Sequence, residues 1–218
     1  MIIKNSQQDI EITIPANVKR VGLKISGGAD SGITGYILSK YVSEERPDIR
    51  IVPITVDQAG KAFQIKFAKR IIEFYKKEFG DIFSEHVTDI SGVGSDFVNR
   101  QHILVTRLYK NNTIQCHFVG LTRNPESKYI PQKIREVYQE PSGRARQDIL
   151  RPTVTGGSYK PLINIDKKGV AELYQKFGLM DTLFPLTRSC SAYTDNFEKH
   201  CRECWFCAER YYGFGRYE

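Results

Sequence analysis

Apolar, β-branched segments alternate with amphipathic helical segments through the first 120 residues, and this alternation limits the folds open to the chain. In chain order the expected strands and helices are 20–25, 30–42, 49–56, 61–79, 82–87, 97–109 and 113–119. Strands separated by helices of this length form right-handed βαβ units, which build a parallel sheet covered on both faces. The sequence therefore predicts an α/β protein with a three-layer α/β/α, Rossmann-like, mostly parallel sheet of about five strands.

The segments outside this alternation are less regular. Residues 1–19 resemble a short β element, because Ile10, Ile12 and Ile14 alternate with polar residues. A last strand is expected over 161–165 and a helix over 167–177. Between them and the main alternation, residues 121–160 are polar and rich in proline and glycine, which is typical of a lid or a binding loop.

A glycine turn joins the first long strand to its helix. It consists of Ser26, Gly27, Gly28, Ala29, Asp30 and Ser31. Glycines let the backbone N–H groups approach phosphate oxygens, and the helix N-terminus adds partial positive charge. The two serines can donate hydrogen bonds, while Asp30 can cap the helix or help to hold Mg²⁺. The turn predicts a phosphate cradle, and the alternative is a glycine turn with a capping aspartate and no ligand.

Four of the five cysteines lie close together near the end of the chain. Cys190, Cys201, Cys204 and Cys207 form a C-x10-C-x2-C-x2-C array. Four thiolates close a tetrahedral Zn²⁺ site and leave no position for water, so the site would be structural. Two alternatives stay open, an iron–sulfur cluster and unligated thiols. The fifth cysteine, Cys116, is expected to be a buried free thiol.

Bulk properties narrow the class of protein. The 218 residues carry a net charge of +7, with the basic residues dispersed along the chain. No basic and aromatic platform is visible, so a small anionic substrate is favoured over nucleic acid, which stays an alternative. The sequence has neither a long apolar run nor a secretory h-region near Met1. A cytoplasmic protein without a membrane partner is therefore expected, and clustered cysteines there favour a metal site over disulfides.

The motifs resemble those of a known family. The turn at 26–31 is similar to the PP-loop of the N-type ATP pyrophosphatases, and residues 20–215 resemble, in order, the 7-cyano-7-deazaguanine synthases of queuosine-type biosynthesis. The matching segments are 56–61, 160–168, 187–190 and 201–210. Three segments depart from the family. Arg188 stands in place of a tryptophan, residues 120–129 replace the segment that usually recognises deazaguanine, and the segment near 94–100 keeps only Asn99 and Arg100 of a family turn.

The resemblance implies an enzyme, a carbon–nitrogen ligase that uses ATP, Mg²⁺ and Zn²⁺. It would adenylate 7-carboxy-7-deazaguanine and use ammonia to form the amide and then the nitrile, with release of AMP and pyrophosphate. The expected catalytic residues are Ser26, Asp30 and Ser31, and Asp57 is expected to join the cradle residues in binding the nucleotide. The expected substrate-binding residues are Asn99, Arg100, Arg123 and Lys128.

Two other functions remain open from the sequence. One is a PP-loop sulfurtransferase that acts on tRNA or a small molecule, and the other is a non-catalytic nucleotide-binding regulatory protein. The expected organisation is an ATP-binding α/β domain over 1–178, with a zinc-binding segment over 179–218 packed on it. The resemblance also implies a homodimer.

Overall fold

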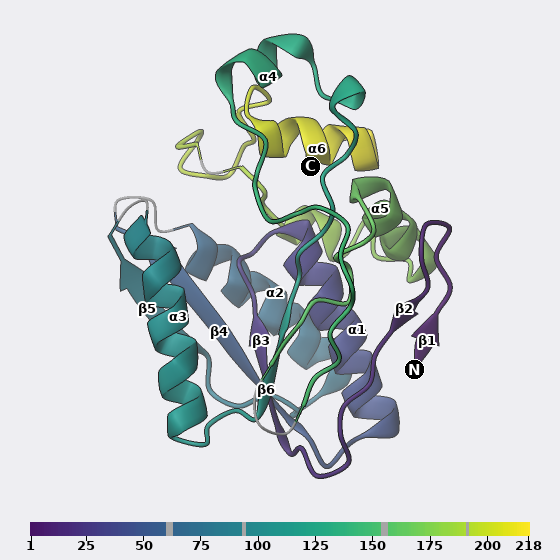
Figure 1. Ribbon diagram of the computed structural model, residues 1–218, viewed down its shortest axis with the longest axis vertical. Helices are drawn as coiled ribbons and strands as arrows, with labels where there is room; N and C mark the ends of the chain where they lie inside the picture. Colours follow the sequence, from purple (N-terminus) through teal and green to yellow (C-terminus); the bar gives the residue numbers. More distant parts are fainter. Residues whose placement is uncertain (60–62, 93–94, 154–156, 191) are drawn as a thin grey trace.

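The computed structural model describes residues 1–59, 63–92, 95–153, 157–190 and 192–218. Its centre is a five-stranded parallel sheet with the strand order β5-β4-β3-β6-β7 (Figure 1). The strands are β3 (Arg20–Lys24), β4 (Arg50–Gln58), β5 (Val87–Ser91), β6 (Cys116–Val119) and β7 (Ser158–Tyr159). A separate antiparallel pair, β1 (Ile2–Ile3) with β2 (Ile10–Glu11), lies near the N-terminus.

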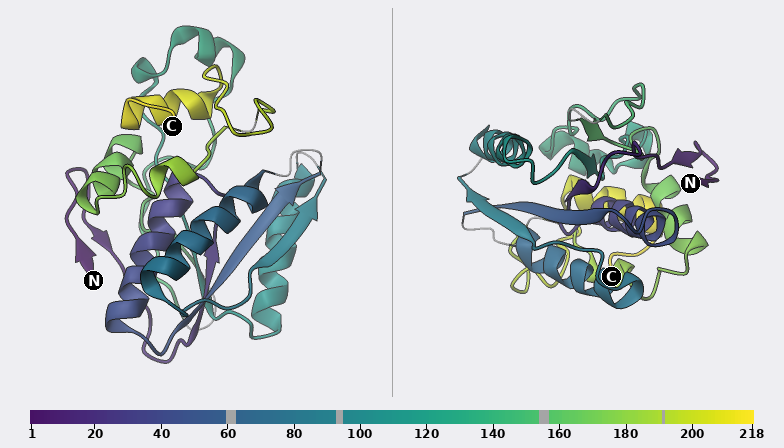
Figure 2. Two further views of the ribbon diagram at one scale, coloured as in Figure 1. Left: turned by 180° about the vertical axis from the view of Figure 1, so that it is seen from behind. Right: turned by 90° about the horizontal axis from the view of Figure 1, so that it is seen from below.

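Helices cover both faces of this sheet. The helices α1 (Ala29–Glu45) and α2 (Gln64–Phe79) lie on one side, and α3 (Ser95–Lys110) lies on the other (Figure 2). The predicted fold class is therefore confirmed. The strand period of two explains the division, since Leu23 and Ile25 belong to the core beneath α1 and α2, whereas Ile54 and Val56 pack with α3.

The remaining helices gather at one end of the molecule. They are α4 (Gln132–Val137), α5 (Lys167–Lys176) and α6 (Trp205–Phe214), with short 3₁₀ turns at Ser127–Tyr129 and Phe184–Leu186. In Figure 1, α4 and α6 lie together beyond the sheet. Ile130 and Ile134 pack against Trp205 and Ala208, so the segment after β6 is held by the C-terminal helix.

The expected element boundaries hold for most of the chain, with two corrections. The strand expected over 82–87 begins only at Val87, because Phe83 makes a single bridge to Ile51 and the chain then continues without strand pairing. The strand expected over 161–165 is a turn, and β7 precedes it. Leu162 and Ile165 are nevertheless buried, so their apolar pattern reflects core packing and not a strand.

Some expected positions lie outside the described residues. They are residues 60–62, 93–94, 154–156 and 191. These residues include the start of the helix expected over 61–79, part of the motif segment 56–61, part of the segment near 94–100 and part of the loop at 121–160. Within the described part of the chain, no helix combines the length and apolar composition that a bilayer crossing requires.

Candidate functional site

The predicted phosphate cradle lies where β3 turns into α1. Gly28 is the N-cap of α1 and makes no side-chain cap hydrogen bond. Gly27 has a φ of +82°, and a Cβ placed on it would lie 2.5 Å from Cβ of Phe67. The amide of Arg188 donates to the carbonyl of Gly27 over 2.7 Å. Only glycine satisfies both the left-handed backbone and the close approach of α2 at this position.

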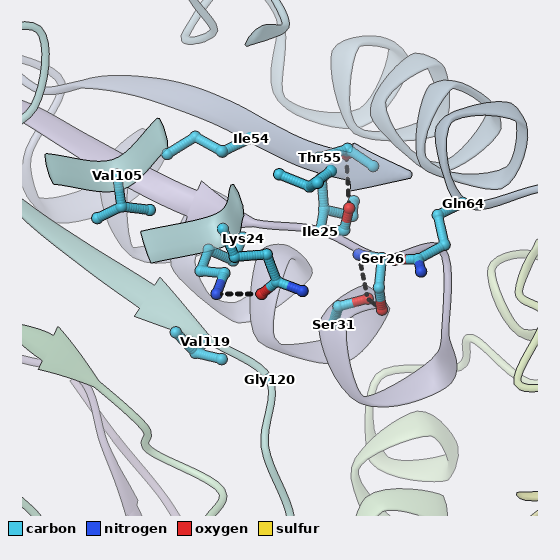
Figure 3. A pocket seen from close by; sticks show the side chains of 12 residues that line it. Lys24, Ile25, Ser26, Ser31, Ile54, Thr55, Gln64, Val105, Val119 and Gly120 are labelled. Atoms are coloured by element: carbon cyan, nitrogen blue, oxygen red, sulfur yellow. Dashed lines mark hydrogen bonds between the residues drawn. The ribbon is translucent and has the colours of Figure 1, made fainter. Parts of the chain in front are cut away.

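The two serines of the cradle are hydrogen-bonded across the turn. The amide of Ser26 donates to Oγ of Ser31 over 3.2 Å, and that hydroxyl donates to the carbonyl of Gly28 over 3.0 Å. The two hydroxyl oxygens lie 3.3 Å apart and face the same hollow (Figure 3). The turn is thus already ordered, with its hydroxyl groups beside the space that a phosphate would enter.

Asp30 is not the helix cap that the sequence allowed. Its Oδ2 accepts a hydrogen bond from Oγ1 of Thr122 over 3.1 Å and forms an ion pair with Nζ of Lys167. Its Oδ1 is buried and has no hydrogen-bond partner among the described residues. A carboxylate oxygen that is shielded and unpaired suits a Mg²⁺ ligand, because Mg²⁺ is commonly bound by one or two carboxylates together with substrate phosphates.

A cleft of about 490 Å³ opens from the cradle. One wall consists of Ser26, Gly28 to Ser31 and Gly120. The opposite wall comes from the C-terminal segment and includes Arg188, Ser189, Phe206 and Glu209. Residues more than 150 positions apart in sequence therefore face one another across a single hollow, and the C-terminal segment forms part of the site.

A smaller side pocket of about 110 Å³ adjoins this cleft on the α3 side of the sheet. The two hollows share five lining residues, which are Ser26, Ser31, Gln64, Gln101 and Gly120. Lys24, the last residue of β3, lines only the side pocket, and its Nζ donates to Oε1 of Gln101 over 2.6 Å.

A network of buried polar side chains joins α6 to the cradle. Arg144 donates to both carboxylate oxygens of Glu209 over 3.0 and 2.7 Å, and to the carbonyl of Thr122 over 2.8 Å. It also donates to Oγ1 of Thr122 over 3.0 Å, and this hydroxyl donates in turn to Asp30. The path from Glu209 through Arg144 and Thr122 reaches the first turn of α1 without a gap.

The four clustered cysteines converge as the sequence predicts. Their sulfur atoms all lie within 4.8 Å of one another. Sγ of Cys201 lies 3.8 Å from that of Cys207, and Sγ of Cys204 lies 3.9 Å from that of Cys190. Hydrogen bonds from Cys204, Cys207 and two backbone amides hold the pKa of Cys190 far below its usual range. Tetrahedral zinc with Zn–S bonds of about 2.3 Å requires sulfur separations of ~3.8 Å, so the donor set fits a single ion.

The group of converging sulfur ligands includes neither His200 nor Cys116. His200 is buried, and its pKa is lowered to about 4, first by desolvation and then by the nearby guanidinium groups of Arg210 and Arg188. Cys116 is fully buried in β6, and burial raises the pKa of its thiol to about 12. Cys116 is therefore an inert core thiol, as the sequence indicates.

The remaining predicted site residues do not line the cleft. Asp57 is fully buried, and its two oxygens accept from the amides of Gln58 and Ile65 over 2.9 Å each, which links the end of β4 to the first turn of α2. Asn99 and Arg100 are exposed on α3, and Arg100 lies 3.8 Å from Asp89. Their roles in binding stay predictions.

The two basic residues of the loop after β6 that were expected to hold substrate also lie outside the cleft lining. Arg123 lies 3.8 Å from Oδ2 of Asp166, and Lys128 is exposed and paired with Glu126. The cleft is instead lined by residues that sequence reasoning did not assign to it, namely Gln64, Gln101, Arg144, Lys167, Arg188 and Glu209. The sequence could have indicated Gln101 through its position, one turn inside a helix that follows the carboxyl end of a strand. It could have indicated Arg188 because this residue stands where the family has a tryptophan.

Comparisons with known proteins bear on the C-terminal segment. The family model described as queuosine biosynthesis protein QueC matches residues 157–218. This segment is QueC-like. The match includes all four clustered cysteines and Glu209, and it confirms, for this part of the chain, the resemblance identified from the motifs.

No curated protein matches the chain. Among solved structures, the U34-tRNA thiolase NcsA from Methanococcus maripaludis, determined with its [4Fe-4S] cluster, is similar over 92% of this chain and 72% of that chain. The sequence identity is 17% and the TM-score is 0.49. A likeness at this level carries no argument about function.

Proposed function

We propose that this chain is an ATP-dependent ligase that adenylates a carboxylate, and that its substrate is 7-carboxy-7-deazaguanine. The supporting observation is the shared cleft: the serine- and glycine-rich turn at 26–31 forms one wall, and the QueC-like segment forms the other. Ligands of open α/β sheets bind at the carboxyl ends of the strands, which is where this cleft lies. Ammonia and the carboxylate would therefore meet ATP between the sheet and α6.

The chemistry balances in two rounds. A carboxylate oxygen attacks the α-phosphorus of ATP and pyrophosphate leaves, which gives an acyl-adenylate. Ammonia attacks the acyl carbon, loses a proton and displaces AMP to form the amide. In the second round the amide oxygen attacks the α-phosphorus of a second ATP and pyrophosphate leaves. Loss of AMP and of the two amide protons then gives the nitrile. No side chain has to act as a nucleophile, so positioning and electrostatic stabilisation carry the catalysis.

The residues of the cradle have defined tasks in this scheme. The amides of Gly28 and Ala29 at the start of α1, with the hydroxyls of Ser26 and Ser31, would donate to phosphate oxygens. Bound Mg²⁺ would stabilise the negative charge that develops on pyrophosphate. Asp30 would hold that ion through Oδ1, while Lys167 and Thr122 fix the position of its carboxylate.

The cysteine site is proposed to hold zinc. In a [4Fe–4S] cluster each thiolate binds a different iron, so the sulfurs would be spread more widely than around one ion. Separations of 3.8 and 3.9 Å support a mononuclear site. With four thiolates the coordination shell is closed, and the ion would pin the start of α6, which carries Phe206 and Glu209 into the cleft wall.

The proposed organisation follows from these contacts. Residues 1–178 would form the ATP-binding domain, and residues 179–218 would complete its cleft instead of folding as a separate unit. The bond from Arg188 to Gly27 and the ion pair of Arg144 with Glu209 support one cooperative body. The homodimer stays a prediction.

The test is an assay of AMP and pyrophosphate release with Mg-ATP, ammonia and 7-carboxy-7-deazaguanine, with the products identified by mass. Nitrile or amide formed together with AMP is the expected result. A protein that binds ATP but releases no AMP with this carboxylate would contradict the proposed substrate, and sulfur incorporation would indicate a sulfurtransferase.

A matched pair of serine variants assigns the activity to the cradle. Ser31→Ala should lower kcat by 10-fold or more, since it removes a hydroxyl beside the phosphate position. Ser39→Ala removes a buried hydroxyl of the same helix that only donates to the carbonyl of Gly35. Equal activity in the two variants would argue against a catalytic cradle.

A further inference from the structure

Lys24 is an unusual residue for its place in the sheet. It is the last residue of β3 and lies on the face that packs against α3, among the aliphatic side chains of Ile54, Val105 and Val119. Its side chain enters the side pocket from the sheet, on the same side as the hydroxyls of Ser26 and Ser31 (Figure 3). An aliphatic residue would suit the surrounding packing, so the ammonium group has no structural reason to be there.

The ammonium has only a neutral partner. Nζ donates to Oε1 of Gln101 over 2.6 Å, and no carboxylate within the described ranges forms an ion pair with it. The charged and titratable groups nearby are Lys160, which follows β7, and His117 of β6, with His102 of α3 beyond it. Desolvation, followed by repulsion from Lys160, lowers the pKa of Lys24 to about 8.

A desolvated cation without a counter-charge costs stability, and proteins retain such groups where a ligand supplies the missing charge. The side pocket is continuous with the cleft through Ser26, Ser31 and Gln64. A ligand bound to the cradle can therefore extend into the side pocket and place an acceptor oxygen near Nζ of Lys24.

We propose that Lys24 is the counter-charge for an oxyanion of the bound ligand, in a subsite that it forms with Gln101 and Ser31 on the α3 side of the cradle. The oxyanion would be either a phosphate of the adenine nucleotide or the carboxylate of the acceptor. The identity of these ligands rests on the proposed function, but the charge requirement comes from the pocket itself. Lys24 thus extends the site beyond the turn at 26–31.

The experiment compares wild-type protein with Lys24→Met, which keeps the length of the side chain and removes its charge. Calorimetric titration with ATP, AMP and adenosine measures the phosphate contribution without turnover. If the oxyanion is a phosphate, Lys24→Met should weaken AMP binding by 10-fold or more and leave adenosine binding unchanged. If it is the carboxylate, nucleotide binding should be unchanged, and KM for 7-carboxy-7-deazaguanine should rise by 10-fold or more.

Lys110→Met is the control, because Lys110 is an exposed residue of the same helix as Gln101 and the substitution makes the same change in net charge. The melting temperature of Lys24→Met should be equal to or above that of the wild type, which separates lost binding from lost folding. Unchanged affinities for AMP and for the carboxylate in Lys24→Met would overturn the proposal.

The outcomes also separate this inference from the proposed function. Suppose that the wild type binds AMP more tightly than adenosine, that Lys24→Met does not, and that the wild type makes no AMP from the carboxylate. This result would support the role of Lys24 and contradict the proposed reaction. Nitrile formation at the wild-type rate and with wild-type KM in Lys24→Met would support the reaction and contradict the proposed role of Lys24. A protein that binds neither nucleotide nor carboxylate would contradict both the proposed function and the role of Lys24.

Discussion

Arg144 and Glu209 form a buried, bidentate ion pair, in which two guanidinium nitrogens lie 3.0 and 2.7 Å from the two carboxylate oxygens. Arg144 is 7% exposed and Glu209 is fully buried. The pair joins the segment after β6 to α6, and Arg144 also binds Thr122, which contacts Asp30. The C-terminal helix and the cradle are therefore parts of one hydrogen-bonded unit, and a change in one is expected to be felt in the other.

Replacing Glu209 by glutamine should leave the charge of Arg144 buried without a counter-charge. We expect the free energy of unfolding to fall by about 3 kcal/mol, because removing one partner of a buried pair costs about 3–5 kcal/mol and the amide oxygen keeps one acceptor. Urea denaturation measures the change. Activity should fall as well, since Thr122 and Asp30 depend on the position of Arg144.

The exposed pair of Lys128 with Glu126 provides the control. Glu126→Gln should change the free energy of unfolding by less than about 1 kcal/mol, because solvent-exposed ion pairs contribute little. The double variant with Arg144→Met should recover part of the stability lost in Glu209→Gln. Equal effects of Glu126→Gln and Glu209→Gln would mean that burial of the pair has no energetic consequence.

Gly27→Ala should damage the cradle directly. The new methyl group would meet Phe67 at 2.5 Å in a backbone region that costs an L-residue about 1–2 kcal/mol. Gly80→Ala places alanine at a similar φ of +73° with no atom within 4 Å, so it tests a positive φ without the clash. We expect AMP release to fall by 10-fold or more in Gly27→Ala only. A comparable loss in both variants would point to backbone strain alone.

The sequence was sufficient for the order of strands and helices along the chain, because the patterns that predict them are local. The stripe of α2 illustrates this: Phe67, Ile71 and Tyr75 recur at helical spacing, and all three are buried. The missed helices, α4 and α6, depend on each other. Ile134 and Trp205 pack across a long sequence separation, and each segment alone carries too short an apolar pattern to predict a helix.

The site was predictable where one short segment carries the chemistry and not where distant segments meet. The cradle and the cysteines are local motifs, and both converge as expected. The binding roles expected of Arg123 and Lys128 rest on charge in a loop and stay predictions, because these side chains lie beside Asp166 and Glu126 and not in the cleft. The contributions of Arg144 and Gln101 arise from tertiary contacts that sequence spacing does not specify.

Lys24 should give the site a distinctive pH dependence. Its pKa in the folded chain is about 8, against an ordinary value of 10.5, so the ammonium is lost as pH rises through 8 and anion binding should weaken above that pH. Calorimetric titrations between pH 6.5 and 9.5 measure this loss of anion affinity, which should be absent in Lys24→Met. The unfolded chain keeps the proton between about pH 8 and 10.5, so the destabilisation by the buried ammonium is fully present below pH 8 and is relieved as pH rises through that interval. A binding profile that is flat through pH 8 in the wild type would contradict the assignment.

Metal content should depend on the clustered cysteines and not on Cys116. The purified protein is expected to contain one zinc per chain, and Cys204→Ser should lose it, because three thiolates no longer close the coordination shell. Cys116→Ala, which opens a small space in β6 far from the cluster in sequence, should keep the full zinc content although its melting temperature falls. Elemental analysis and thermal unfolding of both variants measure these outcomes.

Chelation of the wild type should release α6 together with its ion pair to Arg144, so the chelated protein should lose stability and AMP release together. Iron in place of zinc would contradict the zinc assignment, and iron together with acid-labile sulfide would contradict the mononuclear site.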